Sequence, residues 1–234
     1  MKEMLVIIPG WGGSHETWKS FTDLAQEKYD VQVIDLPCFG DEPCPKDVWG
    51  VVDYANFVKQ RISQLPNRPI AILGHSFGGV VATSLAANNP AICTKLIICG
   101  APIIRRKRGI SKSIIWLAAK MGKILFKLPF VEKLDVFAKK AFYRIIHSDY
   151  NKTSGIQREI FKKIIQEDQS GILSSISIPT LVIFGDKDTY VHPSDGEKIA
   201  HMIVGSKLEM VSGGKHGLHI QQPENLFRII DNFI

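Results

Sequence analysis

The sequence has few cysteines and no long apolar run, and both deficits narrow the classes of protein it can encode. Four cysteines in 234 residues are too few and too scattered for a disulfide framework. The charge-free stretch 176–184 is about half as long as the ~18 residues that a membrane span requires. The apolar start, residues 4–8, is too short for a signal peptide and no small-residue cleavage site follows it. We therefore expect a cytoplasmic protein whose cysteines remain reduced thiols.

Metal-ligand spacings are also missing, because the chain contains neither a CxxC nor an HExxH pattern. We expect no metal and no organic cofactor. Hydrophobic residues make up 45% and charged residues 22% of the chain, which is ordinary for a globular protein and excludes disorder, collagen and a coiled coil. With no internal repeat, this length fits one domain or one domain with an insertion.

Positive charge is concentrated in one part of the chain. Residues 103–170 hold 16 basic and 6 acidic residues, a net charge of +10, whereas the remainder carries a net charge of −4. Two interpretations stay open, a solvated helical surface and a docking surface for an anionic partner. Lysines near Trp116 on one side of an amphipathic pattern also allow contact with a membrane surface. Nucleic-acid binding is not expected, because no recognised motif accompanies the charge.

Outside this basic segment, short strand patterns alternate with helical ones, as in βαβ units with a parallel sheet. Most strand patterns are continuous Val, Ile and Leu runs, which is typical of strands covered on both faces. We predict an α/β fold with a mostly parallel sheet of about six strands flanked by helices. The predicted strands are Leu5–Ile8, Val31–Ile34, Ile70–Leu73, Leu96–Cys99, Leu181–Phe184 and Lys207–Val211. The predicted helices are Thr17–Lys28, Val52–Gln64, Gly78–Asn88, Pro193–Met202 and Pro223–Phe233.

The basic segment breaks this rhythm, since it has long helical patterns and no convincing strand. We predict an all-helical cap at residues 102–174, inserted into a core of residues 1–101 and 175–234. Helices are plausible at 112–128, 131–146 and 154–167, the first starting after Ser111 and stopping at Pro129.

The strongest chemical signal is Gly74-His75-Ser76-Phe77-Gly78-Gly79, which lies between a strand and a helix. A G-x-S-x-G pattern in this setting is typical of a nucleophile elbow, in which a sharp turn exposes the serine hydroxyl above the sheet. The glycines are needed because a Cβ two residues before or after the serine would clash. Ser76 is therefore the predicted nucleophile.

A serine hydroxyl needs a base, and a histidine base needs an acid to orient it. His216 is the predicted base, because it lies in a glycine-rich loop after the last strand pattern; His192 and His201 are interpreted as structural, and His219 as an entrance or helix residue. Two carboxylates, Asp186 and Asp188, follow the strand Leu181–Phe184, and Asp188 is preferred. Asp35 precedes the nucleophile and is interpreted as bracing a loop.

The order Ser, Asp, His and the elbow resemble the α/β-hydrolase superfamily with a helical cap, over essentially the whole chain. Further matches are Pro9-Gly10-Trp11-Gly12-Gly13, residues 35–40, and the segment 214–224 around the histidine. The resemblance implies an oxyanion hole made by the backbone N–H groups of Trp11 and Phe77. Two departures, Pro9 where the family usually has His and Cys38 in the second loop, suggest different packing around that hole. The family's usual first hairpin is also missing, so the sheet should be nearly all parallel.

The resemblance implies a serine esterase that works through an acyl-enzyme on a small-molecule ester. Apolar residues of the cap leave two interpretations open, a pocket for an apolar acyl group and packing of the cap on itself and on the core. Because His216 must be neutral to act as a base, acylation should fall below about pH 6–7. Thioester, lactone and C–C bond hydrolysis and perhydrolysis stay open, whereas the related dehalogenases and epoxide hydrolases place aspartate at the elbow.

Two alternative functions also stay open, and the sequence leaves the oligomeric state open too. The layout is similar to that of pimeloyl-carrier methyl esterases, whose arginine-rich caps suggest docking of an acidic acyl carrier protein on the basic cap. A catalytically silent binding protein on the same fold is the alternative of a different class.

Overall fold

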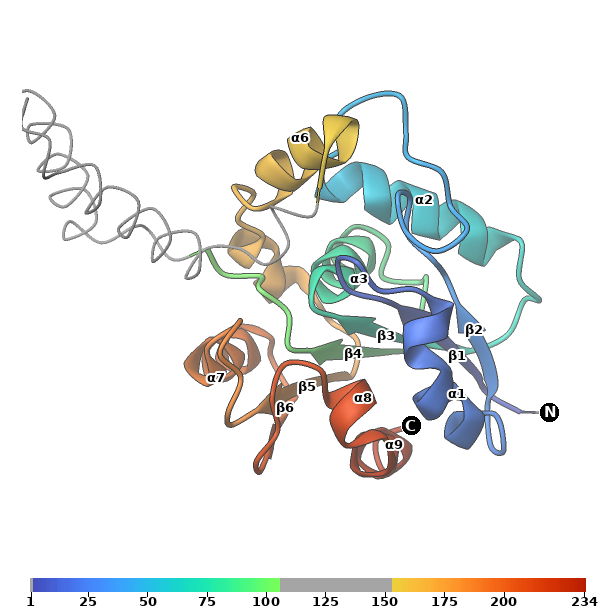
Figure 1. Ribbon diagram of the computed structural model, residues 1–234. Coiled ribbons are helices and arrows are strands. Elements are labelled where there is room, and N and C mark those ends of the chain that lie inside the picture. The colour runs from blue at the N-terminus through green and yellow to red at the C-terminus, as the bar shows by residue number, and fades with distance from the viewer. Residues whose placement is uncertain (1, 106–152) are drawn as a thin grey trace, which may run out of the picture.

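The computed structural model describes residues 2–105 and 153–234, which form a six-stranded sheet flanked by helices (Figure 1). The strand order is β2-β1-β3-β4-β5-β6, and every neighbouring pair is parallel. The prediction of a mostly parallel α/β sheet is confirmed, and all six predicted strands are present. Their bounds are β1 Met4–Ile8, β2 Asp30–Val33, β3 Ile70–His75, β4 Lys95–Cys99, β5 Thr180–Gly185 and β6 Lys207–Val211.

Strand β1 shows why both faces of the sheet are covered. Met4, Val6 and Ile8 lie in one buried cluster, while Leu5 and Ile7 lie in a second. The first cluster is completed by helices α2 (Val51–Ser63), α3 (Phe77–Asn88) and α7 (Pro193–Met202), and the second by α1 (Lys19–Ala25) and α9 (Pro223–Asp231). Successive side chains of a strand point to opposite faces, so a strand buried on both sides must be apolar throughout. Figure 1 shows α2 and α3 on one side of the sheet and α1 and α9 on the other.

The helices connect the strands in the way the sequence predicts, with small differences at their ends. The predicted helix Thr17–Lys28 is divided into a 3-10 turn η1, His15–Trp18, and a shorter helix α1, Lys19–Ala25. The predicted closing helix is preceded by a separate short helix α8, Leu218–Gln221, because Pro223 starts a new helix. The other bounds are α2 Val51–Ser63, α3 Phe77–Asn88, α7 Pro193–Met202 and α9 Pro223–Asp231.

The predicted cap is described only in part. Between β4 and β5 the structure describes a helix α6, Gly155–Ile164, and a 3-10 helix η3, Ser170–Ser175. The predicted helices at 112–128 and 131–146 lie outside the described residues, so the division into core and cap stays a prediction. Among the described residues no helix combines the length and apolarity that crossing a bilayer requires.

One cysteine expectation is wrong, because Cys38 and Cys44 form a disulfide. Cys38 has a φ of +78°, and its N–H bonds back to the carbonyl of Glu42 at 3.1 Å. This tight turn brings the two Cα atoms to 4.1 Å. The sequence spacing allows the two cysteines to lie near each other in a loop, and the error was to expect that the pair stays reduced. Cys93 and Cys99 are free and buried, as expected. Since disulfides are rare in the reducing cytosol, the cytoplasmic location stays a prediction.

Candidate active site

Ser76 lies in a strained turn between β3 and α3, with φ +52° and ψ −120°. The turn is possible because the residues two positions before and after Ser76 are glycines. A Cβ on Gly74 would lie 2.5 Å from the carbonyl oxygen of Gly78, and one on Gly78 would lie 2.1 Å from the carbonyl oxygen of Ile8. A hydrogen bond of 2.8 Å from the Ser76 N–H to the carbonyl of Cys99 ties the turn to the end of β4. The elbow thus has the geometry that the G-x-S-x-G pattern predicts.

The three residues predicted as a triad meet at one edge of the sheet. The Nε2 atom of His216 lies 3.0 Å from the Oγ of Ser76, and its Nδ1 lies 2.7 Å from Oδ2 of Asp188. A carboxylate accepts, so Nδ1 carries the proton and donates to Asp188, which leaves Nε2 free to accept from the serine hydroxyl. This tautomer is the one that a general base needs.

Asp188 is held in place independently of His216. Its Oδ1 atom accepts hydrogen bonds from the backbone N–H groups of Tyr190, at 2.8 Å, and Val191, at 3.0 Å, and its side chain is 1% exposed. The competing carboxylate, Asp186, is exposed. The structure therefore brings Asp188, and not Asp186, to the imidazole.

The remaining late histidines take other places. His192 caps the start of α7, where its Nδ1 accepts from the Ser194 N–H at 3.2 Å, and His201 is exposed on the same helix. His219 is buried in α8, and its ring stacks on Trp18 at 4.2 Å between centroids. Burial and the neighbouring His216 lower the pKa of His219 to about 4.

The loop after β1 runs beside the serine, as the resemblance to the superfamily implies. A Cβ on Gly10 would lie 3.0 Å from the Cβ of Ser76, and the Trp11 ring packs edge-on against Phe77 with centroids 5.7 Å apart. Phe77 is the first residue of α3, where backbone N–H groups have no acceptor within the helix. Trp11 and Phe77 thus flank Ser76, while the role of their N–H groups stays a prediction.

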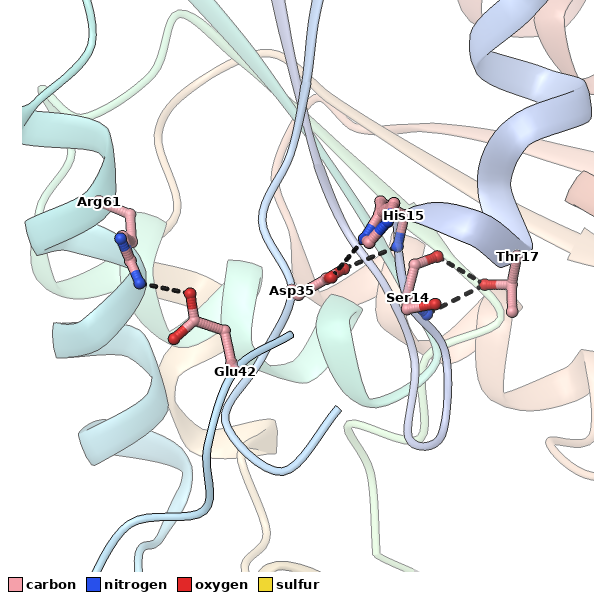
Figure 2. A network of polar contacts seen from close by, with 6 residues as sticks. All are labelled: Ser14, His15, Thr17, Asp35, Glu42 and Arg61. Carbon is pink, nitrogen blue, oxygen red and sulfur yellow. Dashed lines mark hydrogen bonds and ion pairs between the residues drawn. The ribbon is translucent and has the colours of Figure 1, made fainter. Parts of the chain in front are cut away.

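Figure 2 shows two polar contacts near the site: one braces the end of the loop after β1, and the other braces the disulfide loop, residues 38–44. Asp35 accepts from the His15 N–H at 2.7 Å through Oδ1 and contacts the His15 Nδ1 at 2.6 Å through Oδ2. This carboxylate raises the pKa of His15. The ion pair between Arg61 and Glu42 ties the disulfide loop to α2. The interpretation of Asp35 as a loop brace therefore agrees with its contacts.

The space in front of Ser76 is a cavity of about 390 Å³. Its lining is largely apolar and includes residues of α6, and Arg105 stands at its wall with its guanidinium bonded to the carbonyls of Ile164 and Glu167. Tyr190 stacks on the His216 ring at 5.1 Å between centroids. The apolar lining residues include Trp11, Trp18, Phe77, Pro102, Phe161, Ile164, Ile165, Val191 and Ile220.

Sequence reasoning missed two aromatic neighbours of the site. Tyr190 follows the acid by two residues, and His75 immediately precedes the nucleophile inside the elbow. The Nε2 atom of His75 lies 2.8 Å from the carbonyl oxygen of His216. Only the tertiary structure shows this contact, because 141 residues separate the partners. Position 75 is an unspecified position of the G-x-S-x-G pattern, so the pattern does not predict the contact.

In this parallel sheet a strained serine turn follows β3, an aspartate follows β5 and a histidine follows β6. This arrangement defines the class of α/β-hydrolases. Comparison with known proteins agrees with this class and identifies a family within it. The profile of the Hydrolase_4 family, described as serine aminopeptidase S33, matches residues 1–223, so the chain belongs to this family. Membership makes the chain a hydrolytic enzyme.

Similar proteins of known activity include an ester hydrolase. The chain is 22% identical to the biotin biosynthesis bifunctional protein BioHC of Cellvibrio japonicus, over 99% of its own length but only 47% of that protein. It is 24% identical to a pimeloyl-[acyl-carrier protein] methyl ester esterase of Neisseria meningitidis serogroup C, over 97% of this chain and 92% of the relative. The crystal structure of a bromoperoxidase from Bacillus anthracis superposes with a TM-score of 0.76 and 21% identity, over 100% and 92% of the two chains. This last likeness shows the fold alone.

Proposed function

We propose that the protein hydrolyses carboxylic esters through an acyl-enzyme formed on Ser76. The observation that carries the proposal is the unbroken pair of contacts from Ser76 Oγ to His216 Nε2 and from His216 Nδ1 to Asp188. A hydroxyl becomes a useful nucleophile only when a positioned base takes its proton. The esterase activity named for the Neisseria relative supports the same reaction class.

In the proposed reaction, Ser76 Oγ attacks the ester carbonyl and passes its proton to His216 Nε2. Asp188 stabilises the imidazolium and keeps its orientation. The backbone N–H groups of Trp11 and Phe77 stabilise the oxyanion, and His216 then protonates the departing alcohol. Water, activated by the same imidazole, cleaves the acyl-enzyme and restores the serine.

The cavity favours an apolar acyl group. About 390 Å³ is enough for a medium-sized organic ligand, and the aromatic rings of Trp11, Phe77 and Phe161 contribute to its walls. Each added CH₂ of an acyl chain that reaches this surface should strengthen binding by about 0.8 kcal/mol. Activity should therefore rise with chain length until the cavity is filled.

A second candidate function is the hydrolysis of an ester carried by an acyl carrier protein. The relatives named as carrier-protein methyl ester esterases and the net +10 charge of residues 103–170 favour it. Most of this charge lies outside the described residues, and α6 contributes Arg158, Lys162 and Lys163. Docking of an acidic carrier through such charges should weaken with salt, because the Debye length is about 10 Å at 0.1 M.

The test combines a covalent probe with a substrate panel. A fluorophosphonate should label the wild-type protein and not Ser76→Ala, and p-nitrophenyl esters of increasing chain length should be hydrolysed by the wild type alone. An amino-acid p-nitroanilide tests the peptidase activity in the family's description. Wild-type protein that is neither labelled nor active on any substrate would overturn the proposal and favour a silent binding protein.

A carrier-linked methyl ester tests the second candidate. Its kcat/KM should fall steeply between 20 and 300 mM salt, while that of a p-nitrophenyl ester should stay nearly constant. Equal salt dependence of the two substrates would exclude docking through the basic segment.

A further inference from the structure

His75 is buried at the junction of three segments that the proposed reaction needs. It is the last residue of β3, directly before Ser76, and is 6% exposed. Its Nδ1 would lie 3.1 Å from a Cβ placed on Gly10, so the ring also lies against the loop that carries Trp11. Its Nε2 lies 2.8 Å from the carbonyl oxygen of His216. One side chain thus touches the elbow, the oxyanion loop and the histidine loop.

The contact with His216 has a defined direction. A carbonyl oxygen can only accept, so His75 Nε2 carries the proton and donates it. The bond fixes the main chain of His216, whereas Asp188 and Ser76 contact its side chain. Residues 212–217 belong to no helix or strand. Backbone hydrogen bonds hold this loop at Gly214 and Gly217, and the bond from His75 holds it at His216.

The surroundings also keep His75 uncharged. Its ring lies 5.0 Å from that of His216 and 4.7 Å from that of His219, centroid to centroid. Burial, together with these two neighbours, lowers the pKa of His75 well below its usual value. A neutral neighbour suits His216, because a positive charge on His75 would oppose the imidazolium that forms during acyl transfer.

We propose that His75 is a positioning residue, which holds the carbonyl of His216 and thereby keeps its imidazole aligned between Ser76 and Asp188. The inference rests on the proposed ester hydrolysis and adds a fourth side chain to it. His75 does not touch the reacting atoms. A displacement of about 1 Å in a catalytic group can cost about 100-fold in rate, so one hydrogen bond to the histidine loop has a measurable effect.

The test separates the hydrogen bond from the packing of the ring. His75→Phe keeps an aromatic ring and removes the donor, whereas His75→Gln removes the ring and retains an N–H donor near the position of Nε2. On a p-nitrophenyl ester, His75→Phe should lower kcat by about 10- to 100-fold with KM changed less than about twofold. The rate of fluorophosphonate labelling should fall in parallel. His75→Gln should recover most of the loss in kcat.

Stability measurements separate a loss of the hydrogen bond from a loss of folding in the His75 variants. His201→Gln, on the exposed side of α7, serves as the control for loss of a histidine, and thermal melting establishes that each variant is folded. If His75→Phe does not fold, His75→Leu takes its place as the variant without a donor. A donor-less variant with wild-type kcat, or a Gln variant as slow as the donor-less one, overturns the positioning role. Wild-type protein without esterase activity instead overturns the proposed function, so the two failures are distinguishable.

Discussion

The burial of His219 makes the protein sensitive to acid in a range where most carboxylates are still ionised. The ring is 6% exposed and stacks on Trp18. Burial lowers its pKa from 6.5 to about 4. Because the folded-state pKa lies below the unfolded one, the unfolded chain binds the proton first as the pH falls. The resulting stability is fully present above pH 6.5 and is lost progressively as the pH falls toward 4.

The size of the effect follows from the shift in pKa. One pKa unit corresponds to 1.36 kcal/mol, so lowering the pH from 7 to 5 should cost about 2 kcal/mol through His219, and lowering it to 4 about 3 kcal/mol. Such a loss is a large part of the 5–15 kcal/mol by which domains are stable. His75, whose pKa is also lowered, adds to it in the same direction.

Urea unfolding at pH 7, 6, 5 and 4.5 measures this dependence. His219→Phe preserves an aromatic surface against Trp18 and removes the titrating group, so the difference in unfolding free energy between wild type and variant should change by about 2 kcal/mol between pH 7 and 5. His201→Gln, which replaces an exposed histidine, should run parallel to the wild type. Parallel curves for His219→Phe and the wild type would refute the reasoning.

Three further predictions concern the contacts among Ser76, His216 and Asp188, the elbow, and the disulfide. Ser76→Ala should lower kcat for p-nitrophenyl esters by about 10⁶-fold and Asp188→Asn by about 10⁴-fold, both with unchanged melting temperature; near-normal rates in either variant would contradict the assigned roles. Gly78→Ala should destabilise the fold by more than about 2 kcal/mol in urea unfolding, because its Cβ would lie 2.1 Å from the carbonyl oxygen of Ile8. Gly171→Ala, whose Cβ meets nothing within 4 Å, is the matched control and should be nearly neutral. Cys44→Ser, or a reducing agent, should lower the unfolding free energy by about 2 kcal/mol, because this is the value expected for a cross-link between residues 6 apart. An unchanged urea midpoint of unfolding would argue against the disulfide in solution.

The sheet could be predicted from sequence because its signal is local. Strands such as Ile70–His75 are continuous apolar runs, and each is followed by a turn or a helical pattern. The elbow could be predicted for the same reason, since its glycines lie within two or three residues of Ser76. Helix ends were predicted less accurately than strands. The helix predicted to begin at Thr17 begins at Lys19, after the 3-10 turn His15–Trp18.

Features that depend on distant or unusual contacts were not predictable from the same patterns. The bond from His75 to His216 joins residues 141 positions apart. The disulfide depends on a positive φ at Cys38, a conformation that non-glycine residues seldom adopt. The stacking of His219 on Trp18 needs α8 to lie beside η1, which no periodicity specifies.

The strand order explains why residues from four separate segments can meet at Ser76. The loop that contains Trp11 follows β1, Ser76 follows β3, Asp188 follows β5 and His216 follows β6, and the carboxyl ends of parallel strands lie along one edge of the sheet. Strand β4 lies between β3 and β5, so its end must leave room for the histidine to reach the serine. Gly100, directly after β4, has a φ of +56°, a conformation that favours glycine, and a Cβ there would lie at ordinary contact distance, 3.4 Å from His216 Nδ1 and 3.6 Å from Asp188 Oδ2. The chain after β4 therefore contributes a glycine beside His216 and Asp188, between the elbow after β3 and the carboxylate after β5.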